Sequence, residues 1–341
     1  MENNPYLENE TRTILITGSS SGIGYQAALK MLDAGHRLIL PCRNSFSSNQ
    51  LLEKIENHFN HALNCSDRVC VPVIDLADLN SIEKCLLELI SKNEYIDTLV
   101  LNAGLQYTGS KQPRWSKQGI ELTFAVNHMA SQYLLKRTLP LLSKSKFPRV
   151  VITSSEVHNP DTPGGRIGKK AGLAKLQGMF SEKGFSMIDG ISEFDADKSY
   201  KDSKLCNVLF GQEAYKRLQA DGIQMPVIAW APGLVIPVGN GGFFRYSRKY
   251  NELGQRLFAL FARDLLRVTE TPQHAGELLK QLATSSKYSE PGFSYFSNRV
   301  ISPGKRTFAK AEISNEASDS SLAKLLWEKT TEMIEISMKS S

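Results

Sequence analysis

The sequence predicts an α/β fold, a doubly wound parallel sheet with helices on both faces. Three observations lead to this prediction. Short apolar runs rich in β-branched residues alternate with helical patterns from residue 13 to about 300, a glycine-rich turn joins the first strand to the first helix, and polar or small residues follow successive strands. Because no linker interrupts this alternation, we expect a single domain over residues 12–310.

The first strand, turn and helix carry the strongest local signal. The run Thr13–Ile16 suits a buried parallel strand, the turn Thr17–Gly24 follows at once, and a helical pattern begins at Tyr25 and ends at Gly35. This order is the one a dinucleotide site needs, because cofactor phosphates bind at a helix N-terminus. The fold is therefore expected to be of the Rossmann type. The predicted phosphate-binding residues are Gly18, Ser19, Ser20, Ser21, Gly22, Ile23 and Gly24.

The three glycines of this turn have separate expected roles. Gly18 would allow the tight turn, Gly22 would let the backbone approach a pyrophosphate, and Gly24 would let helix and strand pack closely.

The end of the second strand predicts which dinucleotide is bound. The run Arg37–Cys42 ends at Arg43, and the only acidic residue between Gly24 and Arg43 is Asp33, inside the first helix. An acidic residue at the strand end would bind the ribose 2′-hydroxyl of NAD, whereas arginine suits the 2′-phosphate of NADP. We therefore expect NADPH. The alternative is a surface arginine with no ligand.

Three further strand ends trace the same ligand edge. The apolar runs Val69–Ile74, Thr98–Leu101 and Arg149–Thr153 each end in polar or small residues, which in a parallel sheet face the ligand crevice. The cofactor contacts expected there are Asp75, Leu76, Asn102, Ala103 and Gly104, and the third run is followed by Ser154 and Ser155.

A tyrosine and a lysine form the candidate catalytic pair. Tyr200 and Lys204 are four residues apart, which places both side chains on one face of a helix. An ammonium beside a phenol favours the phenolate, so the tyrosine proton would become available near neutral pH. Taken alone, the same spacing also describes a solvated helix face.

The ordered motifs resemble the short-chain dehydrogenase/reductase family over roughly residues 12 to 300. The matching motifs are Thr17-Gly18-x-x-x-Gly22-x-Gly24, Asn102-Ala103-Gly104, Asn127, Ser155, Tyr200-x-x-x-Lys204 and Pro232-Gly233. The resemblance implies that Ser155 orients the substrate oxygen and Tyr200 exchanges the proton. It also implies that Lys204 lowers the pKa of Tyr200 and holds the nicotinamide ribose, and that Asn127 sustains a water relay. The cofactor contacts it implies include Tyr200, Lys204, Pro232 and Gly233. Two alternatives remain open: Asn127 could cap a helix turn, and Ser154 could face the site instead of Ser155.

Within that family, further stretches are similar to the light-dependent protochlorophyllide reductases. They are Val126-Asn127-His128, Gly172–Gly178, Met187–Gly190, Tyr200–Asn207, Gly242–Arg245 and Leu325–Glu328, together with a long insertion at residues 156–199. This resemblance implies a tetrapyrrole substrate and a light-dependent step. One departure is Leu234, which follows Pro232-Gly233 where the reductases carry a cysteine thought to assist catalysis. Leucine supplies apolar packing but no proton.

Three functions follow from these residues and the resemblance. The favoured one is hydride transfer from NADPH to a C=C bond of a protochlorophyllide-like tetrapyrrole, with Tyr200 as the proton donor. The first alternative is an NADPH-dependent carbonyl reductase or retinol-type dehydrogenase acting on an apolar ketone or aldehyde. The second is a non-catalytic protein that binds pigment or NADPH.

Composition excludes several other classes. The five cysteines are an odd number without a Cys-x-x-Cys pair, so we expect no disulfide framework, no zinc site and no other metal. The net charge of +6 is spread along the chain, which argues against nucleic acid as a partner. Residues 1–11 form a polar tail that is expected to be neither signal nor transit peptide, and no run of 18 apolar residues occurs. Cytoplasm is the expected location.

Two C-terminal regions have more than one interpretation. Residues 236–270 include a stretch of interleaved aromatic and basic residues at 243–250 and an apolar pattern at 257–266. They are interpreted as a lid over the substrate, as a peripheral membrane contact, or as ordinary core. Residues 311–319 are expected to be a polar linker to a helix that packs back on the domain or forms an oligomer contact. The expected buried face of that helix is Leu322, Leu325, Leu326, Thr330 and Met333.

Overall fold

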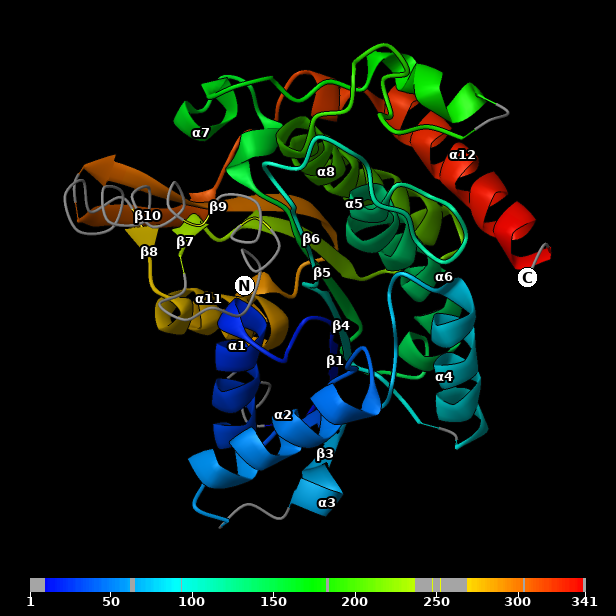
Figure 1. The fold of residues 1–341 in the computed structure, drawn as a ribbon. Helices are drawn as coiled ribbons and strands as arrows, with labels where there is room; N and C mark the ends of the chain where they lie inside the picture. Colours follow the sequence, from blue (N-terminus) through cyan, green and yellow to red (C-terminus); the bar gives the residue numbers. More distant parts are fainter. Residues whose placement is uncertain are drawn as a thin grey trace.

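The computed structural model describes residues 10–61, 65–92, 94–181, 184–236, 269–302 and 304–339, and the single residues 247 and 252. Its centre is an eight-stranded sheet in the order β10-β9-β6-β5-β4-β1-β2-β3, parallel throughout except for the β9–β10 pair (Figure 1). The strands are β1 (Thr13–Ile16), β2 (Arg37–Ile39), β3 (Val69–Cys70), β4 (Thr98–Leu101), β5 (Arg149–Thr153), β6 (Pro226–Ala231), β9 (Gly292–Ser302) and β10 (Lys305–Lys310). A separate parallel pair joins β7 (Leu234–Val235) to β8 (Thr269–Glu270). The predicted fold class is confirmed.

The central strands are buried on both faces, which explains their continuous apolar runs. The second and third strands are shorter than the sequence pattern predicted. β2 ends at Ile39 and β3 at Cys70, although an isolated bridge between Cys42 and Val73 continues their pairing. Each predicted run contains a proline, Pro41 or Pro72, and proline has no N–H to give to the ladder.

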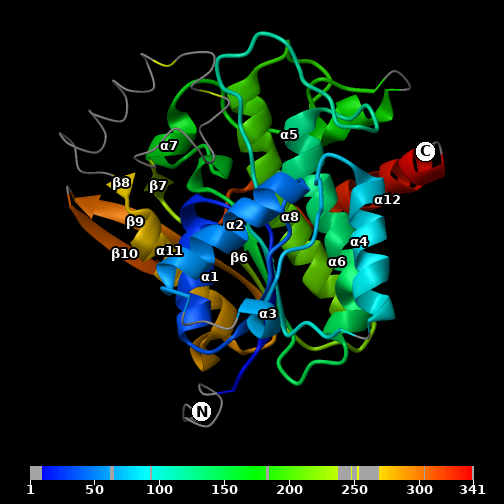
Figure 2. The same cartoon turned by 60° about the horizontal axis from the view of Figure 1, so that its bottom comes forward.

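Helices cover both faces of the sheet, as Figures 1 and 2 show. One face is packed by α1 (Gly22–Asp33), α2 (Ser45–His58) and α11 (Pro272–Thr284). The other is packed by α4 (Leu79–Ser91), α6 (Ala130–Leu142) and α8 (Ala196–Ala220), with α12 (Ser320–Lys339) lying outside them against α8. α1 begins at Gly22, three residues before the predicted start, because the glycine turn leads directly into it. Gly35, at φ +92°, follows its C-cap as predicted.

Shorter helical segments join these elements. They are α3 (Cys65–Arg68), α5 (Leu122–Phe124), the π-helical turn η2 (Ala125–Met129), η3 (Glu156–His158), α7 (Pro163–Arg166), η4 (Ala174–Phe180), η6 (Ser286–Tyr288) and η7 (Glu316–Ser318). The π-helical turn lies between α5 and α6 in one continuous helical stretch, and such turns occur often at functional sites.

The C-terminal region is part of the packed domain. Within residues 311–319, the expected polar linker, Ala317 is fully buried and Glu316 accepts a 2.8 Å hydrogen bond from the Leu173 backbone N–H. The helix after them packs back on the domain, with Trp327 stacked on Phe210 at 5.8 Å between ring centroids. Its buried face includes Leu322, Leu326 and Thr330, whereas Leu325 and Met333 are only half-buried.

Two of the sequence predictions fall largely outside the described residues. Residues 1–9 of the predicted polar tail and residues 237–268 of the predicted lid, apart from 247 and 252, are not among them. Within the part of the chain that the structure describes, no helix is both long enough and apolar enough to cross a bilayer.

Candidate active site

The glycine turn between β1 and α1 forms the first part of the candidate site. Gly18 has φ +71°, and a Cβ there would lie 2.8 Å from the Ala103 Cα; a Cβ on Gly24 would lie 2.4 Å from the Gly18 carbonyl oxygen. Both positions therefore require glycine for close packing. Gly22 has φ +59° with open space where a Cβ would be, so its backbone is approachable.

The α1 N-terminus opens toward the same edge. Its N-cap, Ser21, makes no side-chain hydrogen bond to the first turn, which leaves the backbone N–H groups of that turn to bind an anion. Ser19 is fully buried, and its hydroxyl has no hydrogen-bond partner among the described residues. The turn has the chemistry of a phosphate cradle.

Asn102 fastens three strand ends together at this edge. Its Nδ2 donates to the Thr17 carbonyl at 3.1 Å, and its Oδ1 accepts from the Thr153 hydroxyl at 3.2 Å. The Thr17 hydroxyl accepts from the backbone N–H groups of Asn102 and Ala103, each at 3.0 Å. Sequence reasoning missed Thr17 and Thr153 in these roles. Thr17 follows β1 and Thr153 ends β5, and each carries a hydroxyl. Neither is part of a sequence motif that predicts these hydrogen bonds.

Arg43 follows β2, the strand next to β1, and Asp75 follows β3, one strand further out. Arg43 is exposed and precedes Asn44, the N-cap of α2. Asp75 is half-buried, and its Oδ1 accepts from the Ala77 N–H at 3.0 Å, so it also holds its own turn. Leu76, half-buried, packs against the core.

Tyr200 and Lys204 share a face of α8, as predicted, but they are not in the expected electrostatic relation. The Lys204 Nζ lies 5.6 Å from the Tyr200 ring centroid and donates to the Thr153 carbonyl at 3.0 Å. Burial raises the pKa of Tyr200, and a hydrogen bond with the Ser155 side chain opposes that shift. The expected lowering of the Tyr200 pKa is therefore wrong for this arrangement, because burial of the phenol outweighs its neighbours. Tyr200 keeps its proton at neutral pH.

Burial acts on the lysine as well. Lys204 is buried, and the loss of water around its ammonium lowers its pKa to about 8. It remains mostly cationic at neutral pH and loses its charge in the mildly alkaline range.

The two serines after β5 point in different directions. The Ser154 hydroxyl is buried and donates to the Lys204 carbonyl at 2.8 Å, so it fastens β5 to α8. The Ser155 side chain reaches Tyr200. The geometry therefore favours Ser155 over Ser154 as the hydroxyl that faces the site.

Asn127 lies in η2 and does not cap a helix turn. Its Oδ1 accepts from the Leu105 N–H at 2.8 Å, and its Nδ2 donates to the Leu105 carbonyl and to the Ser203 hydroxyl, each at 3.0 Å. Both amide hydrogens are thus used inside the protein. The side chain holds the segment after β4 against α8, and Gly104 lies between them, where a Cβ would be 3.3 Å from the Lys204 Nζ.

The Pro232-Gly233 turn after β6 is fixed by two residues that sequence reasoning missed. Asn298 Nδ2 donates to the Pro232 carbonyl at 3.1 Å and to the Glu270 Oε2 at 2.8 Å. Gly233 has φ +83°, and a Cβ there would lie 2.9 Å from the Asn298 carbonyl oxygen. Leu234, half-buried, begins β7 directly after this turn.

These parts define a class of protein. A phosphate cradle at a helix N-terminus, with a phenol, a hydroxyl and an ammonium near the adjoining strand ends, suits proton transfer beside a bound dinucleotide. Within the described residues, no three histidine, cysteine or acidic side chains are grouped so as to hold a metal ion. The chain belongs to the short-chain dehydrogenase/reductase family, whose model, described as short chain dehydrogenase, matches residues 12–166.

Individual relatives agree with this family. The chain is 30% identical over 324 residues to a chloroplastic protochlorophyllide reductase of Marchantia paleacea, covering 93% of this chain and 66% of that enzyme. Among solved structures, an uncharacterised Mycobacterium paratuberculosis protein matches with TM-score 0.64 and 22% identity, covering 95% of this chain and 93% of that one. The Pseudomonas aeruginosa RhlG/NADP complex matches with TM-score 0.61 and 20% identity over 88% of this chain and 98% of that one. At these identities the two structures show the fold alone.

Proposed function

We propose that this protein is an NADPH-dependent oxidoreductase that reduces a C=C bond of a protochlorophyllide-like tetrapyrrole, with Tyr200 as the proton donor. The observation that carries the proposal is the grouping of Tyr200, Ser155 and Lys204 at the end of β5. Asn102 joins that strand end to the start of the glycine turn. Similarity to a protochlorophyllide reductase over 93% of the chain supports the substrate class. The coarser function, an NADP-dependent oxidoreductase, rests on the family.

The cofactor assignment rests on the residues that follow β1 and β2. Arg43 provides an exposed guanidinium after β2, suited to a 2′-phosphate, and the α1 N-terminus provides N–H groups for the pyrophosphate. RhlG, which has the same fold, was solved with NADP. Gly18, Gly22 and Asn102 would shape the phosphate and ribose pocket, and Lys204 would hold the nicotinamide ribose.

The protein's own groups would act on the proton and on substrate position. When bound, the nicotinamide supplies the hydride. Tyr200 keeps its proton on the phenol oxygen until the adjacent carbon of the substrate takes it, and Ser155 holds that phenol by a hydrogen bond. The buried Lys204 ammonium would stabilise the phenolate that remains. Leu234 would offer an apolar surface to the substrate.

A second candidate is favoured by Leu234. Where the protochlorophyllide reductases carry a thiol after Pro-Gly, this chain has a side chain without a proton. Reduction of an apolar ketone or aldehyde needs only the Tyr200, Ser155 and Lys204 groups, and so tolerates leucine there.

Absorbance spectra of the purified protein with protochlorophyllide and NADPH separate the two candidates. Spectra are taken in darkness and after brief illumination. The proposal expects a red-shifted product that requires both light and NADPH. Pigment binding without conversion, or no pigment binding, would contradict the proposal, and turnover of apolar carbonyl compounds would then support the second candidate.

Tyr200→Phe tests the proton donor. The variant removes the phenol proton and keeps the ring, so turnover should fall at least about 10²-fold while the Kd for NADPH changes less than about threefold. Tyr215→Phe, on the same helix and half-buried, is the matched control. Retained turnover in Tyr200→Phe would refute the assigned role.

A further inference from the structure

The residues flanking Tyr200 are tied to the rest of the domain on several sides. The Ser199 hydroxyl donates to Glu121 Oε2 at 2.9 Å, and the Ser203 hydroxyl accepts from Asn127 at 3.0 Å. These bonds hold α8 to the α5–η2 segment. Neither bond reaches the neighbouring face of the helix, which carries Lys198 and Asp202.

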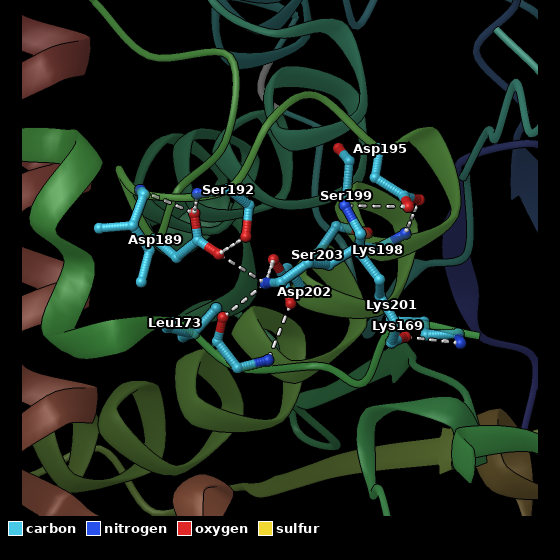
Figure 3. A network of polar contacts seen from close by, with 12 residues as sticks. Lys169, Leu173, Asp189, Ser192, Asp195, Lys198, Ser199, Lys201, Asp202 and Ser203 are labelled. Atoms are coloured by element: carbon cyan, nitrogen blue, oxygen red, sulfur yellow. Dashed lines mark hydrogen bonds and ion pairs between the residues drawn. The ribbon is translucent and has the colours of Figure 1, made fainter. Parts of the chain in front are cut away.

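On that side, charged side chains of α8 bind one residue of the insertion. The Lys198 Nζ donates to the Gly172 carbonyl at 2.7 Å and forms ion pairs with Asp202 at 2.6 Å and Asp189 at 3.1 Å (Figure 3). Asp202 Oδ1 accepts from the Gly172 N–H at 2.9 Å. Both backbone groups of Gly172 are thus held by side chains one helical turn apart. We call Lys198, Asp189 and Asp202 the clamp.

The clamp acts on the back of the catalytic helix. Lys198 and Asp202 are four residues apart and share a face, as do Tyr200 and Lys204. Around a helix axis, side chains two residues apart point about 200° away from each other. The face with Lys198 and Asp202 is therefore nearly opposite the face with Tyr200 and Lys204. The clamp therefore contacts no reacting group, and any effect on the chemistry must pass through the position of α8.

The clamped segment is held in a conformation that side chains rarely adopt. Directly after Leu173, Ala174, Lys175 and Leu176 have φ values of 44°, 55° and 63°. Left-handed backbone is unfavourable for residues other than glycine, so three in succession persist only where the surroundings fix them. Besides the clamp, Glu316 accepts from the Leu173 N–H at 2.8 Å, and Leu173 and Leu176 are fully buried.

We propose that Lys198, Asp189 and Asp202 are positioning residues that lock the insertion at Gly172 onto the back of α8 and so fix Tyr200 and Lys204 for catalysis. This inference rests on the proposed function. All three side chains are buried, and one ammonium faces two carboxylates, so the clamp carries one uncompensated negative charge when both carboxylates are ionised. Release of the clamp would let the strained segment relax and α8 shift.

The excess charge makes the clamp sensitive to protonation. Burial raises the pKa of Asp202 to about 7, opposed by Lys198 and by the Gly172 N–H, whereas hydrogen bonds from Ser192 and the Lys198 ammonium lower the pKa of Asp189 despite its burial. Asp202 is therefore the carboxylate that takes a proton first. A cavity of about 10 Å³ beside it has room for one water. The other titratable groups around it are Glu121 of the α5 N-cap, Glu316 of η7 and Cys206 of α8.

Asp202→Asn tests the clamp by removing its charge while keeping an acceptor for the Gly172 N–H. At pH 8 we expect amide exchange over residues 172–180 to rise about tenfold, the Kd for NADPH to rise severalfold, and kcat to fall about tenfold with little change in KM. The matched control is Glu213→Gln, which removes another ion pair spaced i, i+4 on α8, with Arg217 at 2.7 Å. It should change none of these values.

The pH dependence separates positioning from simple stability. Corrected for intrinsic rates, exchange over residues 172–180 in the unmodified protein should increase as the pH falls from 8 to 6, because Asp202 loses its charge. Asp202→Asn should show no such change. Lys198→Met and the double variant Lys198→Met/Asp202→Asn should show about equal increases in amide exchange and about equal losses of kcat. The reason is that each variant disrupts the same group of interacting side chains.

Two results would overturn the inference. One is unchanged exchange over residues 172–180 in Asp202→Asn. The other is faster exchange with unchanged NADPH affinity and kcat, which would make the clamp structural only. If the unmodified protein reduces no tetrapyrrole, the proposed function fails. Amide exchange and NADPH affinity then still test whether the clamp positions α8.

Discussion

At the scale of single residues, the proposed catalytic pair, Tyr200 and Lys204, shows how burial changes the pKa of a side chain. Burial raises the pKa of Tyr200 and lowers the pKa of Lys204, because it penalises phenolate and ammonium alike. The Lys204 Nζ donates to the Thr153 carbonyl at 3.0 Å. In this arrangement Tyr200 is suited to give a proton, which is the direction that a reductase needs.

Lys204→Met should stabilise the fold at neutral pH. Below pH 8 the lysine is charged in both states, so the folded state bears the full cost of burying the ammonium. This cost is about 3 kcal/mol for a pKa lowered from 10.5 to about 8. As the pH rises from 8 to 10.5 the folded protein loses that proton first, and the cost disappears. Urea unfolding at pH 7 and pH 10 checks this expectation.

The control for that measurement is Lys216→Met, an exposed lysine on the same helix, which should leave stability nearly unchanged. A Lys204→Met variant less stable than the unmodified protein at pH 7 would contradict the burial argument. Asn207 Nδ2 still donates to the Thr153 carbonyl at 3.3 Å, so that acceptor is not left unpaired in the variant.

Arg43→Ala tests the cofactor at the same scale. A charge-assisted contact to a 2′-phosphate contributes roughly 1.5–3 kcal/mol, so the Kd for NADPH should rise about tenfold or more, whereas that for NADH should hardly change. Fluorescence titration with both cofactors measures the two constants. Equal weakening of NADPH and NADH would remove Arg43 from the phosphate site.

At the scale of elements, glycines set how closely helices approach. Gly276 of α11 packs on α1, and a Cβ there would lie 2.6 Å from the Gln26 Cβ and 2.9 Å from the Ala27 backbone nitrogen. α1, whose N-terminus is proposed to bind the cofactor phosphates, packs on the same face of the sheet. The contact between these two helices therefore supports the position of the cofactor site.

Gly276→Ala should destabilise the protein by about 1–2 kcal/mol, even though alanine favours helix by about 1 kcal/mol, because overpacking against backbone costs more. Thermal unfolding measures the loss. Gln273→Ala, exposed on the same helix, is the control and should be neutral or slightly stabilising. A stabilised Gly276→Ala variant would mean that α11 moves away from α1 at little cost.

At the scale of the whole molecule, the features predictable from sequence were those with a local signature. Apolar runs predicted the central strands. Gly35 predicted the end of α1, and its φ of +92° is the conformation that makes glycine suitable there. The same reasoning overextended β2 and β3, since it ignored the missing N–H groups of Pro41 and Pro72. It also omitted the β9–β10 pair at the far edge of the sheet.

The candidate site was predictable in part for the same reason. The spacing of Tyr200 and Lys204 is visible in the chain, whereas the partners that orient them lie far away in sequence. Asn298, which fixes the Pro232 turn, is 66 residues away, and Thr17 meets Asn102 across 85. The insertion has no periodicity that predicts three left-handed residues or the pairing of Gly172 with Asp202. Such contacts depend on the assembled fold.

The place of β1 in the sheet has a consequence for synthesis of the chain. β1 lies in the interior of the sheet between β2 and β4, so the first strand to be made needs a neighbour that begins only at Thr98. At roughly 5–20 residues per second, a ribosome takes about 4–16 s to make that stretch. During this time β1 can pair on one edge only, with β2, and its other edge has no strand to bind. The nascent chain therefore exposes unpaired backbone N–H and C=O groups of β1 for seconds, a period in which it can pair with other chains.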